Sequence, residues 1–139
     1  MPLKSFGDGL LFFIPESNMK GETPLILFNS ICEILSSSEP YLRHVKIAAA
    51  YCKNAYDITF IKNAPDIYGK DIDLTARLAS LAGSKEILMN SDFVERIRAG
   101  YKNTGNKAQY KEVKEIVGPW PVMLKGFKNY VNIYKLIKP

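Results

Sequence analysis

Residues 66–81 read DIYGKDIDLTARLASL, and this stretch decides the fold more clearly than any other part of the chain. Gly69 is typical of a tight turn, and the residues after it follow the period of an amphipathic helix. The buried face of this helix would consist of three leucines, Leu74, Leu78 and Leu81. Asp73 and Arg77 are four residues apart and would project side by side on another face. The stretch therefore predicts a turn followed by a helix that presents a carboxylate and a guanidinium.

Taken alone, Asp73 and Arg77 have an ordinary explanation. Most Asp–Arg pairs at this spacing are solvated ion pairs that stabilise a helix by about 0.3–0.5 kcal/mol. A functional role for either residue therefore needs support from the rest of the chain.

The first sixty residues predict a hairpin, a helix and two strands. Residues 3–6 and 10–14 flank Asp8-Gly9, which is a strong hairpin signal. Thr23 would cap a helix with Pro24 at its first position, and three serines at 36–38 would end it. Its core positions would be Leu27, Ile31, Ile34 and Leu35. The apolar run 45–51 predicts a central strand buried on both faces, and residues 56–61 predict another strand.

The second half continues with mixed elements. The helix after Gly69 would stop at a C-cap, Gly83, and residues 86–89 would form a short strand. Asn90-Ser91 would open a helix that ends at Gly100. Residues 102–108 predict a flexible loop, and residues 110–117 and 131–137 predict a closing pair of strands. This order indicates an α+β fold with a mixed or antiparallel sheet.

Charge is distributed unevenly along this sequence of 139 residues, whose net charge is +5. Residues 101–139 hold eight lysines and two glutamates, so this part carries +6 and the remainder about −1. Such a basic segment could attract nucleic acid or nucleotide phosphates. A solvated sheet face is the default explanation, because the lysines alternate with Tyr and Val in strand-like segments and include no arginine.

Composition narrows the function classes. Cys32 and Cys52 are isolated in apolar surroundings, which favours buried thiols over a disulfide, and a single histidine makes a zinc site improbable. No apolar run approaches the roughly 20 residues that cross a bilayer. The first residues also lack the pattern of a signal peptide. We therefore expect a cytoplasmic protein with no membrane segment.

Three motifs, in order along the chain, resemble those of the class III nucleotidyl cyclases, the adenylate and guanylate cyclases. Lys4-x-Phe6-Gly7-Asp8-Gly9 is similar to the Lys-x-Ile-Gly-Asp-Gly hairpin of that family. Asp66-x-x-Gly69 through Arg77 is similar to its Asp-x-x-Gly-x-x-Val-Asn-x-Ala-x-Arg segment. Leu124-Lys125-Gly126 is similar to its Leu-Lys-Gly segment before the last strand. The resemblance implies a ferredoxin-like or palm-type α+β sheet over residues 1–139, as a single cyclase-homology domain.

The resemblance also implies a reaction, in which ATP is converted to cyclic AMP and pyrophosphate with two Mg²⁺ or Mn²⁺ ions. Arg77 would stabilise the transition state as a catalytic residue, and Asp73 stands at the ribose-orienting catalytic position. The remaining roles would be adenine recognition by Lys4 and Asp66, triphosphate binding by Lys125, and metal binding by Asp8. Sites of this family form between head-to-tail subunits, so a homodimer is expected.

Departures from the family pattern predict weak activity. The chain starts almost at the Gly-Asp-Gly hairpin, so the domain would be partial at its N-terminus and would supply one metal aspartate where two are expected. Asp73 replaces an asparagine, and an ionised carboxylate beside a triphosphate repels it and donates no hydrogen bond. Tyr51-Cys52-Lys53 stands where His-x-Gly is usual.

Three hypotheses follow. The first is an adenylate cyclase-like domain with little or no turnover. The second is a non-catalytic nucleotide-binding or dimerisation module. The third, a basic RNA-binding α+β domain, is the least favoured because arginine is scarce in the basic segment.

Overall fold

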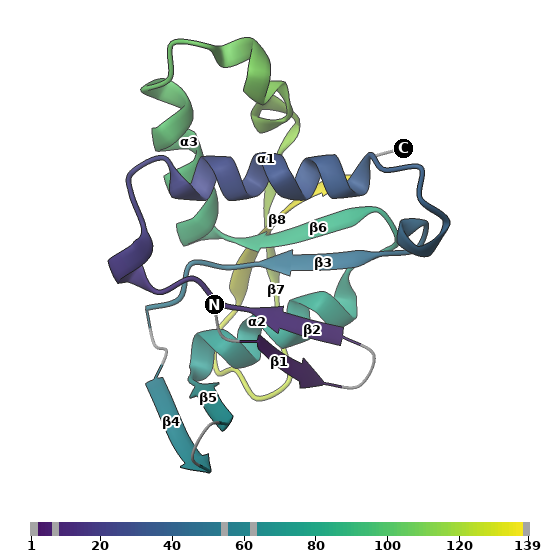
Figure 1. The fold of residues 1–139 in the computed structure, drawn as a ribbon. Helices are drawn as coiled ribbons and strands as arrows, with labels where there is room; N and C mark the ends of the chain where they lie inside the picture. The colour runs from purple at the N-terminus through teal and green to yellow at the C-terminus, as the bar shows by residue number, and fades with distance from the viewer. Residues whose placement is uncertain (1–2, 7–8, 54–55, 62–63, 138–139) are drawn as a thin grey trace.

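The computed structural model describes residues 3–6, 9–53, 56–61 and 64–137, with the backbone alone for residues 3–6, 16, 56–61 and 64–68 (Figure 1). The fold is α+β, as the order of elements predicts. Its α-helices are α1 (Thr23–Leu35), α2 (Lys70–Leu81) and α3 (Ser91–Lys102). Shorter 3₁₀ segments are η1 (Glu16–Asn18), η2 (Pro40–Leu42) and η3 (Lys107–Glu115).

The main sheet has four strands, in the order β3 (Lys46–Ala49), β6 (Glu86–Asn90), β8 (Val131–Ile137) and β7 (Val117–Val122). Strands β3 and β6 run parallel, whereas β8 is antiparallel to both β6 and β7. The sheet is therefore mixed. Parallel neighbours need a crossover connection, and here that connection contains α2.

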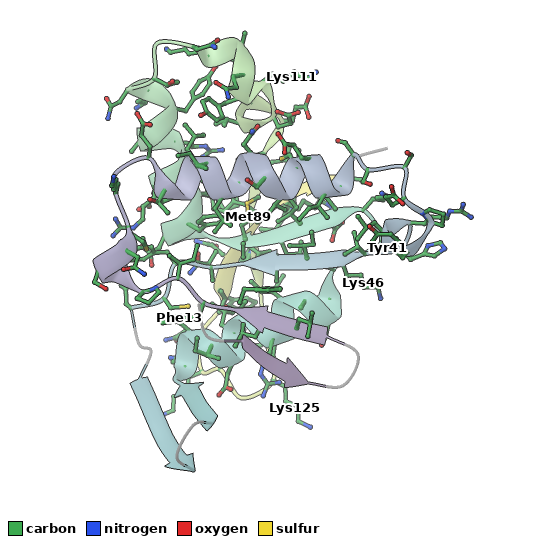
Figure 2. The ribbon with its side chains drawn as sticks, viewed as in Figure 1. Phe13, Tyr41, Lys46, Met89, Lys111 and Lys125 are labelled. Atoms are coloured by element: carbon green, nitrogen blue, oxygen red, sulfur yellow. The ribbon has the colours of Figure 1, made fainter. Side chains whose placement is uncertain are left out.

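Two hydrophobic clusters lie on opposite faces of this sheet, because successive side chains of a strand point to opposite sides. On one face α1 and α3 cover Ile87, Met89 and Leu136, and Figure 2 shows Met89 beneath α1. On the other face α2 packs Leu74 and Leu78 against Leu88 and Ile133 of the sheet. We call these the two-helix face and the α2 face.

Two hairpins stand apart from the main sheet. Strand β1 (Leu3–Phe6) pairs antiparallel with β2 (Gly9–Phe12), as the Asp-Gly signal predicts. Strand β4 (Tyr56–Ile61) pairs antiparallel with β5 (Ala64–Tyr68), with a register shift between Ile58 and Ile61. The β4–β5 hairpin lies inside the crossover that connects β3 to β6, and Figure 1 shows it extending away from the main sheet.

Helix boundaries agree with the sequence to within a few residues, but several details differ. The residue that caps α1 is Glu22, and Thr23 is the first helical residue, whose Oγ1 accepts a bond from the Lys20 N–H. Ile34 is 40% exposed and Leu81 is 55% exposed, so neither is a core residue. Ile31 and Leu35 are buried as predicted, and Leu25, Phe28 and Cys32 complete the core side of α1.

The positions of Gly83 and Gly100 relative to the ends of α2 and α3 also differ from the prediction. Gly100 lies within α3, where an added methyl group would be 3.3 Å from Cβ of Leu25, so the glycine permits close packing of α1 on α3. Gly83 lies one residue beyond the C-cap of α2, which is Ala82 in an extended conformation. Neither glycine therefore ends a helix in the way that the sequence suggests.

The two predicted strands at 45–51 and 110–117 need correction. Strand β3 is an edge strand of the sheet, and it is apolar because α1 and α2 lie over its two faces rather than because it has two neighbours. Residues 107–115 form 3₁₀ turns with a break in helical geometry at Tyr110, and the strand begins only at Val117. Apolar residues every third position, Tyr110, Val113 and Ile116, fit the three-residue period of such turns.

Candidate functional site

Helix α2 fixes the positions of Asp73 and Arg77. The Gly69 carbonyl accepts bonds from the N–H groups of Ile72 and Asp73, both at 3.1 Å, and thereby starts the helix. Buried Leu74 and Leu78 hold one side of α2 against the sheet. Asp73 and Arg77 consequently lie on the exposed side, as the spacing predicts.

The segment Leu124–Phe127 forms a tight turn between β7 and β8. The Phe127 N–H donates to the Leu124 carbonyl at 3.0 Å, and Gly126 has φ = 87°. A glycine with positive φ at the third position is typical of a type II turn. Leu124 is buried in the core of the α2 face, so the turn is anchored and Lys125 occupies its exposed corner. Figure 2 shows the Lys125 side chain pointing away from the body of the protein.

Arg77 meets this turn although the two segments are far apart in the sequence. A methyl group added at Gly126 would lie 3.4 Å from Nη2 of Arg77, so the guanidinium lies against the glycine backbone. The Cζ atom of Arg77 is also 6.0 Å from the centroid of the Phe127 ring. Arg77 thus contacts Gly126 and Phe127, which directly follow Lys125 in the turn. Arg77 and Lys125 are two of the positions that the sequence singled out.

Lys70 joins the same group and was not expected from the sequence. Its Nζ atom lies 5.5 Å from the centroid of the Phe127 ring, so one ring contacts two cations of α2. Among the side chains that the structure describes, no carboxylate lies within ion-pairing distance of Lys70, Arg77 or Lys125. The ordinary ion pair between Asp73 and Arg77 is therefore not formed. We call Lys70, Arg77, Lys125 and Phe127 the cationic turn site.

The other candidate residues lie elsewhere or outside the described part. Lys4 lies on β1 opposite Leu11, and Asp66 lies on β5 opposite Ile58, in two separate hairpins whose side chains at these positions are not described. Asp8 lies outside the described residues. The adenine-recognition and metal-binding roles of these three residues stay predictions from the resemblance.

A second arrangement ties the ends of β3 and β6 to α3. The buried Asn90 side chain accepts bonds through Oδ1 from the N–H groups of Tyr51 and Phe93, at 3.1 and 3.0 Å. Its Nδ2 donates to the Tyr51 carbonyl at 3.0 Å. Asn90 therefore caps α3, as the sequence predicts. It also links the end of β6 to the segment that follows β3, and the sequence does not predict this link. The guanidinium of Arg96 lies 3.6 Å from the centroid of the Tyr51 ring above this bond network.

Lys53 and Cys52 connect this region to α2. The Lys53 N–H donates to Oδ2 of Asp71 at 2.7 Å, and its Nζ lies 3.3 Å from Oδ1 of Asp92. Burial raises the pKa of the Cys52 thiol to about 11, the Asp71 charge adds to this rise, and a hydrogen bond with Thr75 opposes it. Because a thiol with this pKa stays protonated at neutral pH, Cys52 is not an activated nucleophile.

Among the described residues, no group of three or more His, Cys, Asp or Glu side chains could hold a metal ion. Within the same residues, every helix is too short or too polar to cross a membrane.

Compared with known proteins, the chain matches no protein-family model, no curated protein sequence and no solved structure.

Proposed function

We propose that the chain is an adenylate cyclase-like nucleotide-binding domain that holds the triphosphate of ATP at the cationic turn site. The observation that carries this proposal is the contact between Arg77 and the Leu124–Phe127 turn. Two of the three sequence motifs that resemble the cyclases supply the two sides of that contact. The sheet is mixed within a general α+β fold, and a ferredoxin-like or palm-type fold is part of the proposal that rests on the resemblance alone.

Charge on the described residues favours a polyphosphate ligand. Three exposed cations stand around one anchored turn, and no described carboxylate pairs with them. Arg77 presents a planar fork of donors that suits phosphate oxygens, and Lys125 supplies a compact charge at the corner of the turn. In the family reaction, an arginine at this position would neutralise the charge that develops at the α-phosphate.

Asp73 favours little or no turnover. Its exposed carboxylate stands on α2 between Lys70 and Arg77 in sequence, where the family pattern has an amide that orients the ribose. An ionised carboxylate repels the phosphates and donates no bond to a ribose oxygen. This residue also favours the second function, a non-catalytic nucleotide-binding module.

The remaining assignments rest on the resemblance. They are adenine recognition by Lys4 and Asp66, a Mg²⁺ or Mn²⁺ ligand at Asp8, a head-to-tail homodimer and a cytoplasmic location.

Calorimetric titration with ATP tests the proposal. We expect measurable affinity that falls about tenfold in Arg77→Gln and in Lys125→Gln, because each variant removes one charged contact to phosphate. Lys111→Gln is the matched control, since Lys111 is an exposed lysine on η3. Equal losses in all three variants would contradict the site, and no ATP binding would contradict the proposed function.

Turnover is measured separately as cyclic AMP formed from ATP with Mn²⁺. We expect ATP binding with little or no product. Robust turnover would refute the proposed weak activity and exclude the non-catalytic alternative.

A further inference from the structure

The Phe127 ring is the one group in the cationic turn site that contacts two charges at once. Lys70 Nζ and Arg77 Cζ lie 5.5 and 6.0 Å from its centroid, within the range in which a cation is attracted to an aromatic face. Phe127 is partly buried and packs against the hydrophobic cluster of the α2 face. The ring is therefore fixed to the core on one side and available to cations on the other.

The spacing of the two cations follows from the helix. Lys70 and Arg77 are seven residues apart, which is close to two turns and about 10 Å along the axis of α2. Both side chains consequently start on the same side of α2 and converge on one ring between them.

The ligand best matched to this arrangement is an extended multivalent anion. Two cations are held about two helical turns apart, and Lys125 stands beside them at the corner of the turn. Asp71 and Asp73 are the described carboxylates on the same helix between the two cations, and Lys70, Arg77 and Lys125 outnumber them. The sum of these charges is positive, which favours a linear polyphosphate over a single carboxylate group.

We propose that Phe127 is a positioning residue that holds Lys70 and Arg77 as a two-cation clamp for the polyphosphate chain of a nucleotide. This inference rests on the proposed function and adds Lys70 and Phe127 to its binding site. Lys70 contacts the anion directly. Phe127 acts through both cations, because it fixes them before the ligand arrives and so reduces the freedom lost on binding.

Inorganic tripolyphosphate is the probe, titrated by calorimetry at fixed low ionic strength. We expect Phe127→Leu and Lys70→Gln each to weaken its binding 3- to 10-fold. Phe127→Tyr keeps the ring and should bind within twofold of the unaltered chain. Lys128→Gln, one residue from Phe127 and exposed, is the matched control for charge alone. Urea unfolding verifies that each variant is folded, and Phe127→Met replaces the leucine variant if that variant is not.

A double-mutant cycle separates positioning from a structural role. If Phe127 acts through Lys70, the loss in the double variant Phe127→Leu with Lys70→Gln will be smaller than the product of the two single losses. The losses in Phe127→Leu with Lys128→Gln will multiply. Independent effects in the first pair, or unchanged binding in Phe127→Leu, would overturn the inference, as would no tripolyphosphate binding by the unaltered chain.

The proposed function can fail independently of this inference. If the chain binds tripolyphosphate through the clamp but does not bind ATP, the nucleotide assignment is wrong and the polyphosphate clamp stands. If the chain binds ATP through Arg77 and Lys125 while Phe127→Leu has no effect, only the role of Phe127 is wrong.

Discussion

The two faces of the main sheet are built differently. On the two-helix face, α1, α3 and η3 bury a continuous apolar core in which side chains such as Phe28 and Leu35 are at most 1% exposed. The α2 face has one helix, a smaller cluster and the Leu124–Phe127 turn, where the exposed Lys125 and the partly buried Phe127 lie beside the cations of α2. The two-helix face therefore supplies stability, whereas the α2 face positions charged and aromatic side chains at the surface.

The largest expected effect lies on the two-helix face. Phe28→Ala should lower the free energy of unfolding by about 3–5 kcal/mol, because it leaves a cavity beneath α1. Urea denaturation measures this loss. Leu10→Ala, at a side chain that is 59% exposed on β2, should change stability by less than about 0.5 kcal/mol. Similar losses in the two variants would remove the distinction between a packed core and a surface.

Asn90 is the last residue of β6 and the N-cap of α3, and its substitution should cause the next largest loss of stability. Asn90→Ala removes a helix cap and leaves the partly buried N–H and carbonyl of Tyr51 without their partner, so we expect a loss of about 2–4 kcal/mol. Asn90→Ser restores the cap alone and should recover about 1 kcal/mol. Asn132→Ala, at an exposed position of β8, is the control. Complete recovery by serine would show that the bonds to Tyr51 contribute nothing.

Gly126 tests the α2 face directly. An alanine there must adopt φ = 87° and places its methyl group 3.4 Å from Nη2 of Arg77. We expect a loss of about 1 kcal/mol in stability from the backbone alone and weaker tripolyphosphate binding from the displaced guanidinium. At Gly105 an added methyl group meets no atom within 4 Å, so Gly105→Ala should leave binding unchanged. Unaltered binding in Gly126→Ala would separate Arg77 from the turn.

Substitution of Asp73 on the α2 face should strengthen anion binding rather than weaken it. Asp73→Asn should raise the affinity for tripolyphosphate about 2- to 4-fold, because it removes a repulsive charge beside the cations. It should cost about 0.3–1 kcal/mol of stability, since Asp73 lies in the first turn of α2. Glu95→Gln on α3 is the control and should alter neither binding nor stability appreciably. A lower affinity in Asp73→Asn would give the carboxylate a binding role.

Cys52 provides the smallest effect at neutral pH. Its pKa is raised to about 11 from 9.0, so alkylation of this thiol should reach half its limiting rate near pH 11, as peptide mapping of the modified protein can measure. The unfolded chain releases this proton first. The stabilisation from the buried neutral thiol is therefore complete below pH 9 and is lost as the pH rises towards 11. A midpoint near pH 9 would show that Cys52 is not shielded by its neighbours.

Local signals in the sequence were sufficient for much of the fold. Asp8-Gly9 predicted the first hairpin, Pro24 placed the start of α1, and Asn90 placed the start of α3. Each of these signals acts within a few residues, so it does not depend on tertiary contacts. The α+β class follows from the same order of elements.

Features set by distant contacts could not be predicted in this way. Residues 45–51 are apolar because helices cover both faces of β3. This pattern does not depend on the number of neighbouring strands, so it could not show that β3 lies at the edge of the sheet. Arg77 and Lys125 were singled out from separate motifs, but their common neighbour Phe127 carries no polar atom to draw attention. Lys70 likewise resembles any lysine at the start of a helix until the ring across from it is seen.

The route of the chain between β3 and β6 has a consequence for variation. These two strands are hydrogen-bonded neighbours, yet β4, β5 and α2 lie between them in sequence. The chain re-enters the sheet directly after α2, and the β4–β5 hairpin is an insertion before that helix. A longer or shorter hairpin would therefore leave the register of Ile47 with Ile87 unchanged. The same sheet is thus compatible with hairpins of different length at this position, each leading into α2.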